Sequence, residues 1–229
     1  MSNKYKILSV GGSIIVPKSG FDVGFLKKFR QLILDEIRKG YKFVLVVGGG
    51  ATCRTYQAAA RALGGLSDSD LDWLGIYTTW YNAEFVRLLF GEVAYKEVIK
   101  NPTKKIKTNK SVILAGGWKP GCSTDRDAVL FAKNFGAREV INLSNFDFVY
   151  SADPKKDPSA VPYKTLSWAE MRKIIGDKWN PGANFPFDPL AVKEAIKMNL
   201  KVAFVCGTNL AEVKKAIEDE SFQGTVVAD

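Results

Sequence analysis

The fold is decided by the stretch Val112-Ile113-Leu114-Ala115-Gly116-Gly117-Trp118-Lys119-Pro120-Gly121-Cys122-Ser123-Thr124-Asp125. A short apolar run, typical of a buried strand, leads into a glycine-rich loop and then into a helical pattern that continues to about Phe135. Backbone amides in such a loop and at a helix start lack intrahelical partners and lie at the positive end of the helix dipole. This junction therefore predicts a site for an anion, with phosphate as the obvious ligand.

Two segments nearer the N-terminus repeat the arrangement. Ile7-Leu8-Ser9-Val10 leads into Gly11-Gly12-Ser13, and Phe43-Val44-Leu45-Val46-Val47 leads into Gly48-Gly49-Gly50. Three junctions between a strand and a glycine loop argue against a chance pattern. They indicate an α/β protein that binds phosphate.

Apolar periodicity predicts strands and helices that alternate along the chain. The expected strands are 7–10, 42–47, 111–115, 139–143, 201–206 and 224–227, with a hairpin near 149–151 and an exposed loop at 152–158. The expected helices are 22–40, 51–63, 68–90, 125–135, 167–175, one that begins at Asp188-Pro189, and 210–219. This order predicts a three-layer α/β/α sandwich with a mainly parallel central sheet.

Length and composition exclude several classes of protein. The 229 residues fit one large domain or two closely joined halves, and 46% hydrophobic with 25% charged residues is typical of a globular chain. The chain contains no histidine, which excludes Ser-His-Asp hydrolysis and imidazole metal sites. It has neither a Gly-x-x-x-x-Gly-Lys-Ser/Thr loop nor a Gly-x-Gly-x-x-Gly motif, so a P-loop nucleotidase or a standard dinucleotide fold is not supported.

Charge, cysteines and apolar runs bear on partners and location. The net charge is +9, but the lysines are spread from Lys4 to Lys215, which favours a solvated surface with affinity for anionic ligands over nucleic-acid binding. The polar start Met1–Lys4 lacks a signal-peptide pattern, and no apolar run is long enough for a membrane span, so we expect a cytoplasmic protein without membrane contact. Cys53, Cys122 and Cys206 suit reduced thiols, with Cys206 expected in the core.

Phosphoryl transfer requires charge neutralisation and in-line positioning, and a few side chains near the loops can contribute. Arg54 lies four residues after Gly50 and can reach a phosphate as a planar donor fork, although a surface role is the alternative. Thr124 and Asp125 stand at a helix start, where they either cap the helix or organise cations. Asp127 is expected to face solvent. From the residues alone, the substrate stays open.

A set of motifs in fixed order carries a family resemblance. The motifs are Gly11-Gly12-Ser13, Val46-Val47-Gly48-Gly49-Gly50 with Arg54, Asp72 with Gly75-Ile76, Gly116-Gly117 with Pro120-Gly121 and Ser123-Thr124-Asp125, Ser144-Asn145, Val149-Tyr150-Ser151-Ala152-Asp153-Pro154-Lys155-Lys156-Asp157-Pro158, Asp188-Pro189-Leu190-Ala191 and Gly224-Thr225. With them the chain resembles the amino acid kinase superfamily, and within it the uridylate (UMP) kinases, most closely their archaeal branch. The resemblance covers nearly the whole chain.

The resemblance implies transfer of the ATP γ-phosphoryl group to UMP with Mg²⁺ carried by ATP, in a single amino acid kinase domain over 1–229. Its first part, 1–143, would hold UMP and the subunit contacts, and 144–229 would hold ATP. The implied ATP-binding residues are Gly12, Ser13, Gly50, Arg54, Ser144, Asn145, Tyr150 and Asp153. The implied UMP-binding residues are Gly49, Asp72, Lys119, Pro120, Gly121, Cys122, Ser123, Thr124 and Asp125. Asp125, Asp188 and Arg54 would be catalytic. Family members commonly form hexamers built from dimers, and the aromatic residues near Trp73, Tyr77, Trp80 and Tyr81 would either bury such a contact or lie in the core.

Three departures from the family pattern bear on the function. Ser9 stands where bacterial relatives usually carry a lysine, so Lys18 or Lys119 would have to supply the cation at the transferred phosphoryl group. Phe148 replaces a common glycine of the adenosine hairpin, and Trp80 stands where archaeal relatives tend to carry arginine. The alternatives to a UMP kinase are a superfamily kinase of another small phosphate or acid, and a non-catalytic relative that binds or stores nucleotides or oxyanions.

Overall fold

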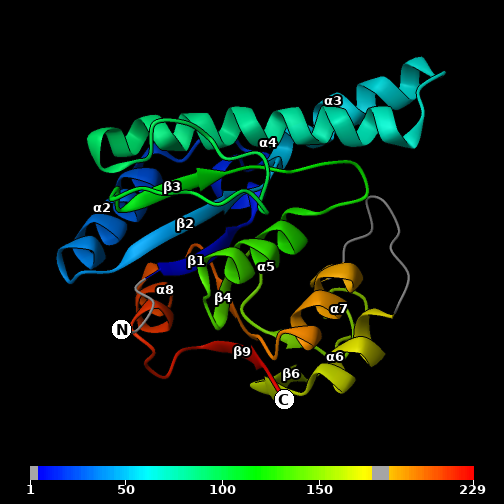
Figure 1. The fold of residues 1–229 in the computed structure, drawn as a ribbon. Coiled ribbons are helices and arrows are strands. Elements are labelled where there is room, and N and C mark those ends of the chain that lie inside the picture. Colours follow the sequence, from blue (N-terminus) through cyan, green and yellow to red (C-terminus); the bar gives the residue numbers. More distant parts are fainter. Residues whose placement is uncertain (1–4, 177–185) are drawn as a thin grey trace.

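A seven-stranded sheet forms the centre of the computed structural model, which describes residues 5–176 and 186–229 (Figure 1). Its strand order is β3-β2-β1-β4-β8-β9-β7. The strands are β1 (Tyr5–Val10), β2 (Lys42–Val47), β3 (Val112–Ala115), β4 (Glu139–Ser144), β7 (Thr165–Leu166), β8 (Lys201–Cys206) and β9 (Gly224–Val227). The first five strands in this order run parallel, and β9 is antiparallel to β8. The mainly parallel sheet expected from the sequence is therefore confirmed.

Helices cover both faces of the sheet, so the three layers are confirmed (Figure 1). The helices are α1 (Gly12–Ile15), α2 (Val23–Arg38), α3 (Gly50–Leu63), α4 (Asp68–Phe90), the 3-10 turn η1 (Gly91–Val93), α5 (Thr124–Phe135), α6 (Trp168–Ile175), α7 (Pro189–Lys197) and α8 (Leu210–Ile217). One apolar core joins the sheet to α5, α6 and α7, and the other joins it to α1, α2, α4 and α8. No helix in the described part of the chain is long and apolar enough to span a bilayer.

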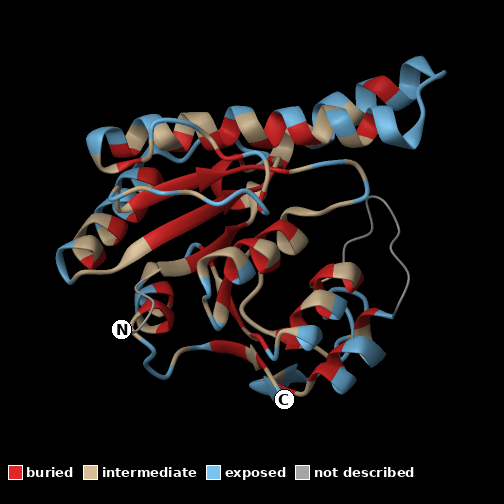
Figure 2. Ribbon diagram, viewed as in Figure 1, coloured by how far each residue is buried: buried red, intermediate tan, exposed pale blue. Residues whose placement is uncertain are grey.

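The central strands alternate their side chains between the two cores, as a pleated strand must. In β2, Val44 and Val46 enter one core, and Phe43, Leu45 and Val47 enter the other. All five are fully buried, and Figure 2 shows the strands at the centre of the sheet as the most continuously buried segments. This explains why the run is apolar throughout instead of alternating with polar residues.

Local signals in the sequence define several helix starts. The Asp22 carboxylate accepts the Phe25 amide at 2.8 Å, and Ser167 forms a capping box with Glu170. Asp188 caps α7 with Pro189 at the first helical position, as predicted. The predicted hairpin is also present, because β5 (Val149–Tyr150) pairs in antiparallel fashion with β6 (Pro162–Tyr163).

One cysteine does not lie where the sequence analysis expected it. Cys206 was expected in the core but is only half-buried, because it ends β8 at the carboxyl edge of the sheet. Its Sγ lies 3.3 Å from Thr208 Oγ1 in the following turn. The single turn α1 was not expected either, since its four residues are too few for helical periodicity to register.

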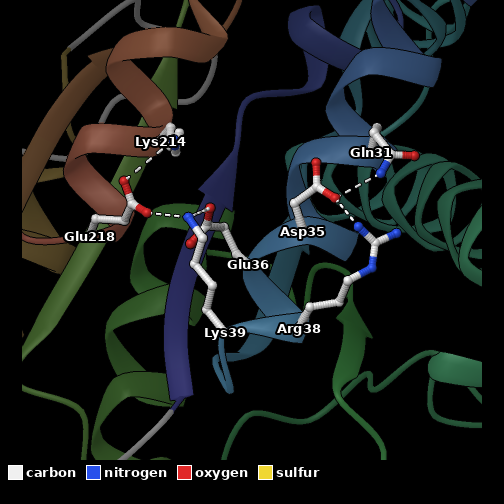
Figure 3. A network of polar contacts seen from close by, with 7 residues as sticks. All are labelled: Gln31, Asp35, Glu36, Arg38, Lys39, Lys214 and Glu218. Atoms are coloured by element: carbon white, nitrogen blue, oxygen red, sulfur yellow. Dashed lines mark hydrogen bonds and ion pairs between the residues drawn. The ribbon is translucent and has the colours of Figure 1, made fainter.

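A polar network joins α2 to α8 at the far end from the glycine loops (Figure 3). The Lys39 ammonium contacts Glu36 Oε1 at 2.8 Å and also the Glu218 carboxylate. Glu36 is fully buried, so Lys39 supplies the charge that this carboxylate requires. The hydrogen bonds to Glu218 and Glu36 raise the pKa of Lys39, and the Lys39 contact lowers the pKa of Glu218.

Candidate functional site

The first two glycine loops meet backbone to backbone at the carboxyl ends of β1 and β2. A Cβ atom on Gly12 would lie 2.0 Å from the Gly50 nitrogen, and Gly50 has a φ of +62°. Within the part of the chain that the structure describes, the amides of Gly12, Ser13, Gly49 and Gly50 have no protein acceptor. Unpaired N–H groups such as these, at the starts of α1 and α3, are suited to binding an anion.

Helix α4 supports both the second and the third glycine loops. Asn82 donates to the carbonyls of Gly48 and Gly49 at 3.0 Å each, and the Thr79 hydroxyl accepts the Gly117 amide at 2.7 Å. The Trp80 indole donates to the Gly117 carbonyl at 2.6 Å. Thr79 and Asn82 were not predicted as site residues. The sequence did hold a signal, since both are polar residues within a largely apolar helix. Both are buried, and buried polar side chains need hydrogen-bond partners.

Asp125 lies at the start of α5, against the ends of β1 and β4. Its Oδ1 accepts hydrogen bonds from Ser9 Oγ at 3.0 Å and from Asn142 Nδ2 at 2.9 Å, while Ser144 Oγ donates to the Asn142 side chain. Desolvation in the site, together with the nearby Asp188 carboxylate, raises the pKa of Asp125 to about 6. Ser9, at the position of the expected lysine, therefore binds the carboxylate through its hydroxyl.

Asp188 approaches the same place from α7. Its carboxylate is almost fully buried, accepts the Leu190 amide at 2.7 Å as the cap of α7, and accepts a short hydrogen bond from Ser123 Oγ. Ser123 in turn caps α5 by accepting the Arg126 amide at 3.2 Å. The packing of α5 against α7 thus brings Asp125 and Asp188 together, although they are 63 positions apart in the sequence.

Asp127 was expected to face solvent, and this expectation is wrong. The residue is fully buried, with Oδ2 accepting the Trp118 amide and Oδ1 accepting the Cys122 thiol, each at 3.0 Å. The glycine-rich loop folds back over the first turn of α5 and covers this side of the helix. Burial raises the pKa of Asp127 to about 7, and burial followed by the Asp127 charge raises the pKa of the Cys122 thiol.

The remaining residues expected to bind UMP lie on the same loop or next to it. The Asp72 carboxylate accepts the Gly121 amide at 2.8 Å, so α4 holds the loop at a further point. Lys119 is exposed, with its ammonium 4.1 Å from the centre of the Trp118 ring. Pro120 and Thr124 are partly exposed on either side of these contacts.

The cations expected near the phosphates lie at the surface. Arg54 is exposed one turn into α3, on the side of Gly50, and makes no hydrogen bond or ion pair with the described residues. Lys18 is exposed in the turn between α1 and α2. Both side chains are therefore available to a ligand phosphate. Neither of them contacts Asp125 or Asp188.

The residues expected to bind adenosine lie at the end of β4 and on the β5–β6 hairpin. Asn145 is exposed directly after β4, and the Tyr150 hydroxyl donates to Asp147 Oδ1 at 3.1 Å. Asp153 orders the exposed loop by accepting the Lys155 amide at 3.0 Å. Phe148 packs edge-on against Tyr150 with ring centres 6.5 Å apart, and it lines a cavity of about 450 Å³ at the opposite edge of the sheet.

The aromatic residues of α4 divide into two groups. Trp80 packs on the third glycine loop, where a Cβ on Gly116 would lie 2.6 Å from its ring, and Lys100 lies 4.1 Å from the ring centre. Trp73, Tyr77 and Tyr81 keep 37%, 57% and 75% of their surface exposed. A position in the core is excluded for these three, so the contact with another subunit stays open for them.

A family profile, curated relatives and a solved structure all place the chain in the same family. The sequence profile of the Amino acid kinase family matches residues 4–206. The curated uridylate kinase of Methanospirillum hungatei is 34% identical over 225 residues, which cover 96% of this chain and 93% of that protein. The crystal structure of uridylate kinase from Archaeoglobus fulgidus has a TM-score of 0.81 and 33% identity, covering 96% of this chain and 98% of that one. A UMP kinase structure from Bacillus anthracis, at 19% identity and a TM-score of 0.78 over 99% of this chain and 96% of that one, shows the shared fold alone.

Proposed function

The chain belongs to the amino acid kinase family, and we propose that it is a uridylate kinase that transfers the γ-phosphoryl group of ATP to UMP, giving ADP and UDP. The observation that carries the proposal is the juxtaposition of Asp125 and Asp188 at the same sheet edge as unpaired amides of two glycine loops. The curated relatives named uridylate kinase extend over nearly the whole chain, which supports UMP as the acceptor.

Positioning and charge neutralisation supply the catalysis, with no covalent intermediate. The amides of Gly12, Ser13 and Gly50 bind the ATP phosphates, and Arg54 folds back onto them from α3. Asp125, which lies in the first turn of α5, and Asp188, which caps α7, orient the reacting groups. Residues 144–229 bind the adenosine through Ser144, Asn145, Tyr150 and Asp153.

UMP binds in the part formed by 1–143, on the loop from Lys119 to Asp125 with Gly49 and Asp72 beside it. Because the Asp72 carboxylate already accepts the Gly121 amide at 2.8 Å, one of its oxygens shapes this loop and the other is available to a ribose hydroxyl. Lys18 or Lys119 supplies the cation that the first strand lacks at Ser9. Both side chains are exposed and flexible enough to reach a bound phosphate.

Magnesium enters with the ATP phosphates in this proposal, and no group of three or more candidate ligands was found among residues 5–176 and 186–229. Asp125 and Asp188 provide carboxylate oxygens, the ligand type that Mg²⁺ prefers, so the residues fit a metal carried by the triphosphate. When bound, the ion neutralises phosphate charge. The proposal also includes a cytoplasmic location, which the three free thiols support, and a hexamer built from dimers through α4.

The test is a coupled assay of ADP production with ATP, magnesium and UMP, beside CMP and a reaction without acceptor. Transfer to UMP with strong rejection of CMP is the expected result, because a pocket that hydrogen-bonds uracil leaves polar groups unpaired with another base. Transfer to a different small phosphate or acid would identify a kinase of another substrate. ATP binding without any transfer would favour the non-catalytic binding protein.

A further inference from the structure

The loop from Trp118 to Ser123 is held by side chains from three helices. Asp72 on α4 accepts the Gly121 amide, and Asp188 on α7 accepts the Ser123 hydroxyl. Asp127 on α5 holds both ends of the remaining segment, because it accepts the Trp118 amide and the Cys122 thiol. The backbone between these two residues is thereby closed over the carboxylate.

The two contacts of Asp127 do not serve its own helix. Ser123 already caps α5, and the Asp127 amide donates to the Ser123 carbonyl at 3.0 Å as an ordinary helical hydrogen bond. The carboxylate points away from the helix into the loop, where its residue is fully buried. A residue without an acceptor at this position would leave the Trp118 amide without its protein partner.

Two neighbouring charged residues affect whether the Asp127 carboxylate is ionised. Arg126, the adjacent cation, favours its ionised form, and Asp188 disfavours it. The Arg126 guanidinium lies 3.9 Å from Glu194 on α7. Both donors to Asp127 come from the loop, and they occupy one oxygen each.

We infer that Asp127 is a positioning residue for the phosphate acceptor, because it fixes the shape of the loop that presents Lys119, Pro120 and Gly121. The inference rests on the proposed function in assigning this loop to the acceptor. Asp127 does not touch the acceptor, since it is buried beneath the loop. It acts by presenting the loop backbone in one conformation before the acceptor arrives.

Steady-state kinetics of Asp127→Ala test the inference by comparing the KM for UMP, the phosphate acceptor, with the KM for ATP, the phosphate donor. We expect the KM for UMP to rise about tenfold while the KM for ATP stays within about twofold. Asp127→Asn keeps an oxygen acceptor for the Trp118 amide and should restore the KM for UMP to within about threefold of the wild type. Equal increases for UMP and ATP, or equal losses in the two variants, would overturn the inference.

Glu170→Ala is the matched control. Glu170 accepts an amide and a hydroxyl from Ser167 at 2.8 and 2.7 Å, so it also accepts two hydrogen bonds, but at the exposed start of α6. It lies outside the residues assigned to either ligand, and we expect both KM values to remain unchanged. If Asp127→Ala does not fold, Cys122→Ala removes one of the two contacts and is tested by amide hydrogen exchange, because Cys122 itself belongs to the loop assigned to UMP and its KM would not separate positioning from direct binding.

Amide hydrogen exchange of the free protein separates this inference from the proposed function. In Asp127→Ala, or in Cys122→Ala if that variant replaces it, peptides covering residues 117–123 should exchange at least about tenfold faster than in the wild type, and peptides of the α2–α8 network should not change. Unchanged exchange in residues 117–123 would overturn the role of Asp127 even in an active enzyme. If the wild type fails to phosphorylate UMP, the proposed function fails, and the exchange result still decides whether Asp127 fixes the loop.

Discussion

Asp125 accepts two hydrogen bonds through one oxygen, and both donors, Ser9 and Asn142, require an acceptor. Both hydrogen bonds favour the ionised carboxylate. Burial works against this form, and the charge of Asp188 adds to the effect, so the pKa lies at about 6 instead of near 4.

This environment predicts a pH dependence of phosphoryl transfer. Above pH 6 Asp125 is ionised, and as the pH falls through 6 it takes up a proton and the rate should fall, approaching tenfold per pH unit below about pH 5. The measurement is kcat/KM for UMP from pH 5 to 8 at constant ionic strength. Asp125→Asn should lower kcat by at least about 100-fold and remove the part of the loss near pH 6 that protonation of Asp125 causes. A flat profile in the wild type would contradict the assignment of Asp125.

The two aspartates of α5 show what the sequence can predict at this scale. The resemblance predicted catalytic roles for Asp125 and Asp188, and the structure brings these two residues close together. Asp127 is only two positions further on, yet it was expected at the surface. Helical periodicity places it on a different side of α5 from Asp125, but whether that side meets water depends on the path of the loop Trp118–Cys122. A contact between a loop and the helix after it is not encoded in periodicity.

The glycine junctions at the ends of β1 and β2 work only as a pair. Gly12 and Gly50 are so close that a Cβ on either would overlap backbone atoms of the other loop, at 2.0 and 2.4 Å. Backbone cannot move aside as a flexible side chain can. The two loops therefore have to separate if either glycine is replaced, and the free amides of both would lose their arrangement.

Gly12→Ala should accordingly destabilise the protein by about 3–5 kcal/mol and lower the Tm by roughly 10 °C, measured by calorimetry. ATP binding should be lost in the fraction that folds. The control is Gly24→Ala in the first turn of α2, where the new Cβ would meet only the Asp22 side chain at 3.3 Å. That change should leave the Tm equal or slightly higher, because alanine favours a helix. A Gly12→Ala protein as stable as the control would refute the close packing.

The Lys39 network is the corresponding feature at the other edge of the sheet (Figure 3). Lys39→Met removes the cation between the buried Glu36 and Glu218, so α2 and α8 should separate more easily. Solvent screens part of the effect because the lysine side chain is 44% exposed, and we expect the Tm to fall by roughly 3 °C or more. Lys214→Met is the matched control, since Lys214 lies 3.9 Å from Glu218 and contacts no buried carboxylate; its Tm should change by less than roughly 1 °C. Equal Tm values would show that Glu36 is stable without Lys39.

The helices and strands were predictable to different degrees because their signals differ in range. Asp22, the Ser167–Glu170 box and Asp188-Pro189 act within one helical turn, and each marked a helix start correctly. The position of β9 between β8 and β7 depends on which strands meet in space, and its antiparallel pairing with β8 was not predicted. The support that α4 gives to two glycine loops is equally non-local, since Asn82 reaches back 34 residues to Gly48.

On the scale of the whole molecule, one sheet passes through both parts that the proposal assigns to separate ligands. Strand β4 ends at Ser144, the proposed boundary, and it pairs with β1 on one side and β8 on the other. The family and the three-layer fold were predicted from the order of the motifs and are confirmed. Subunit assembly could not be predicted from the sequence. The helix α4 is apolar on two sides, and such a helix can face either a core or a partner subunit.

The exposed face of α4 leads to a prediction about assembly. Tyr77, Tyr81 and Leu88 are 57%, 75% and 63% exposed and lie four and seven residues apart, so they form one stripe along a helix of 23 residues. A stripe of this kind is typical of a contact between proteins, and the proposed dimer would bury it. Tyr81→Glu places a charge in the middle of that contact and should shift the protein to smaller species in sedimentation velocity at micromolar concentration.

The matched control is Val161→Glu, which changes a similarly exposed apolar residue beside the β5–β6 hairpin, far from α4 in the sequence. It should sediment as the wild type does. Since the Tyr81 side chain is 75% exposed, the Tm at high dilution should be the same in Tyr81→Glu and the wild type, and only the concentration dependence of the Tm should differ. A wild-type protein that is monomeric at all concentrations, or a Tyr81→Glu protein that still assembles, would exclude this face of α4 as the subunit contact.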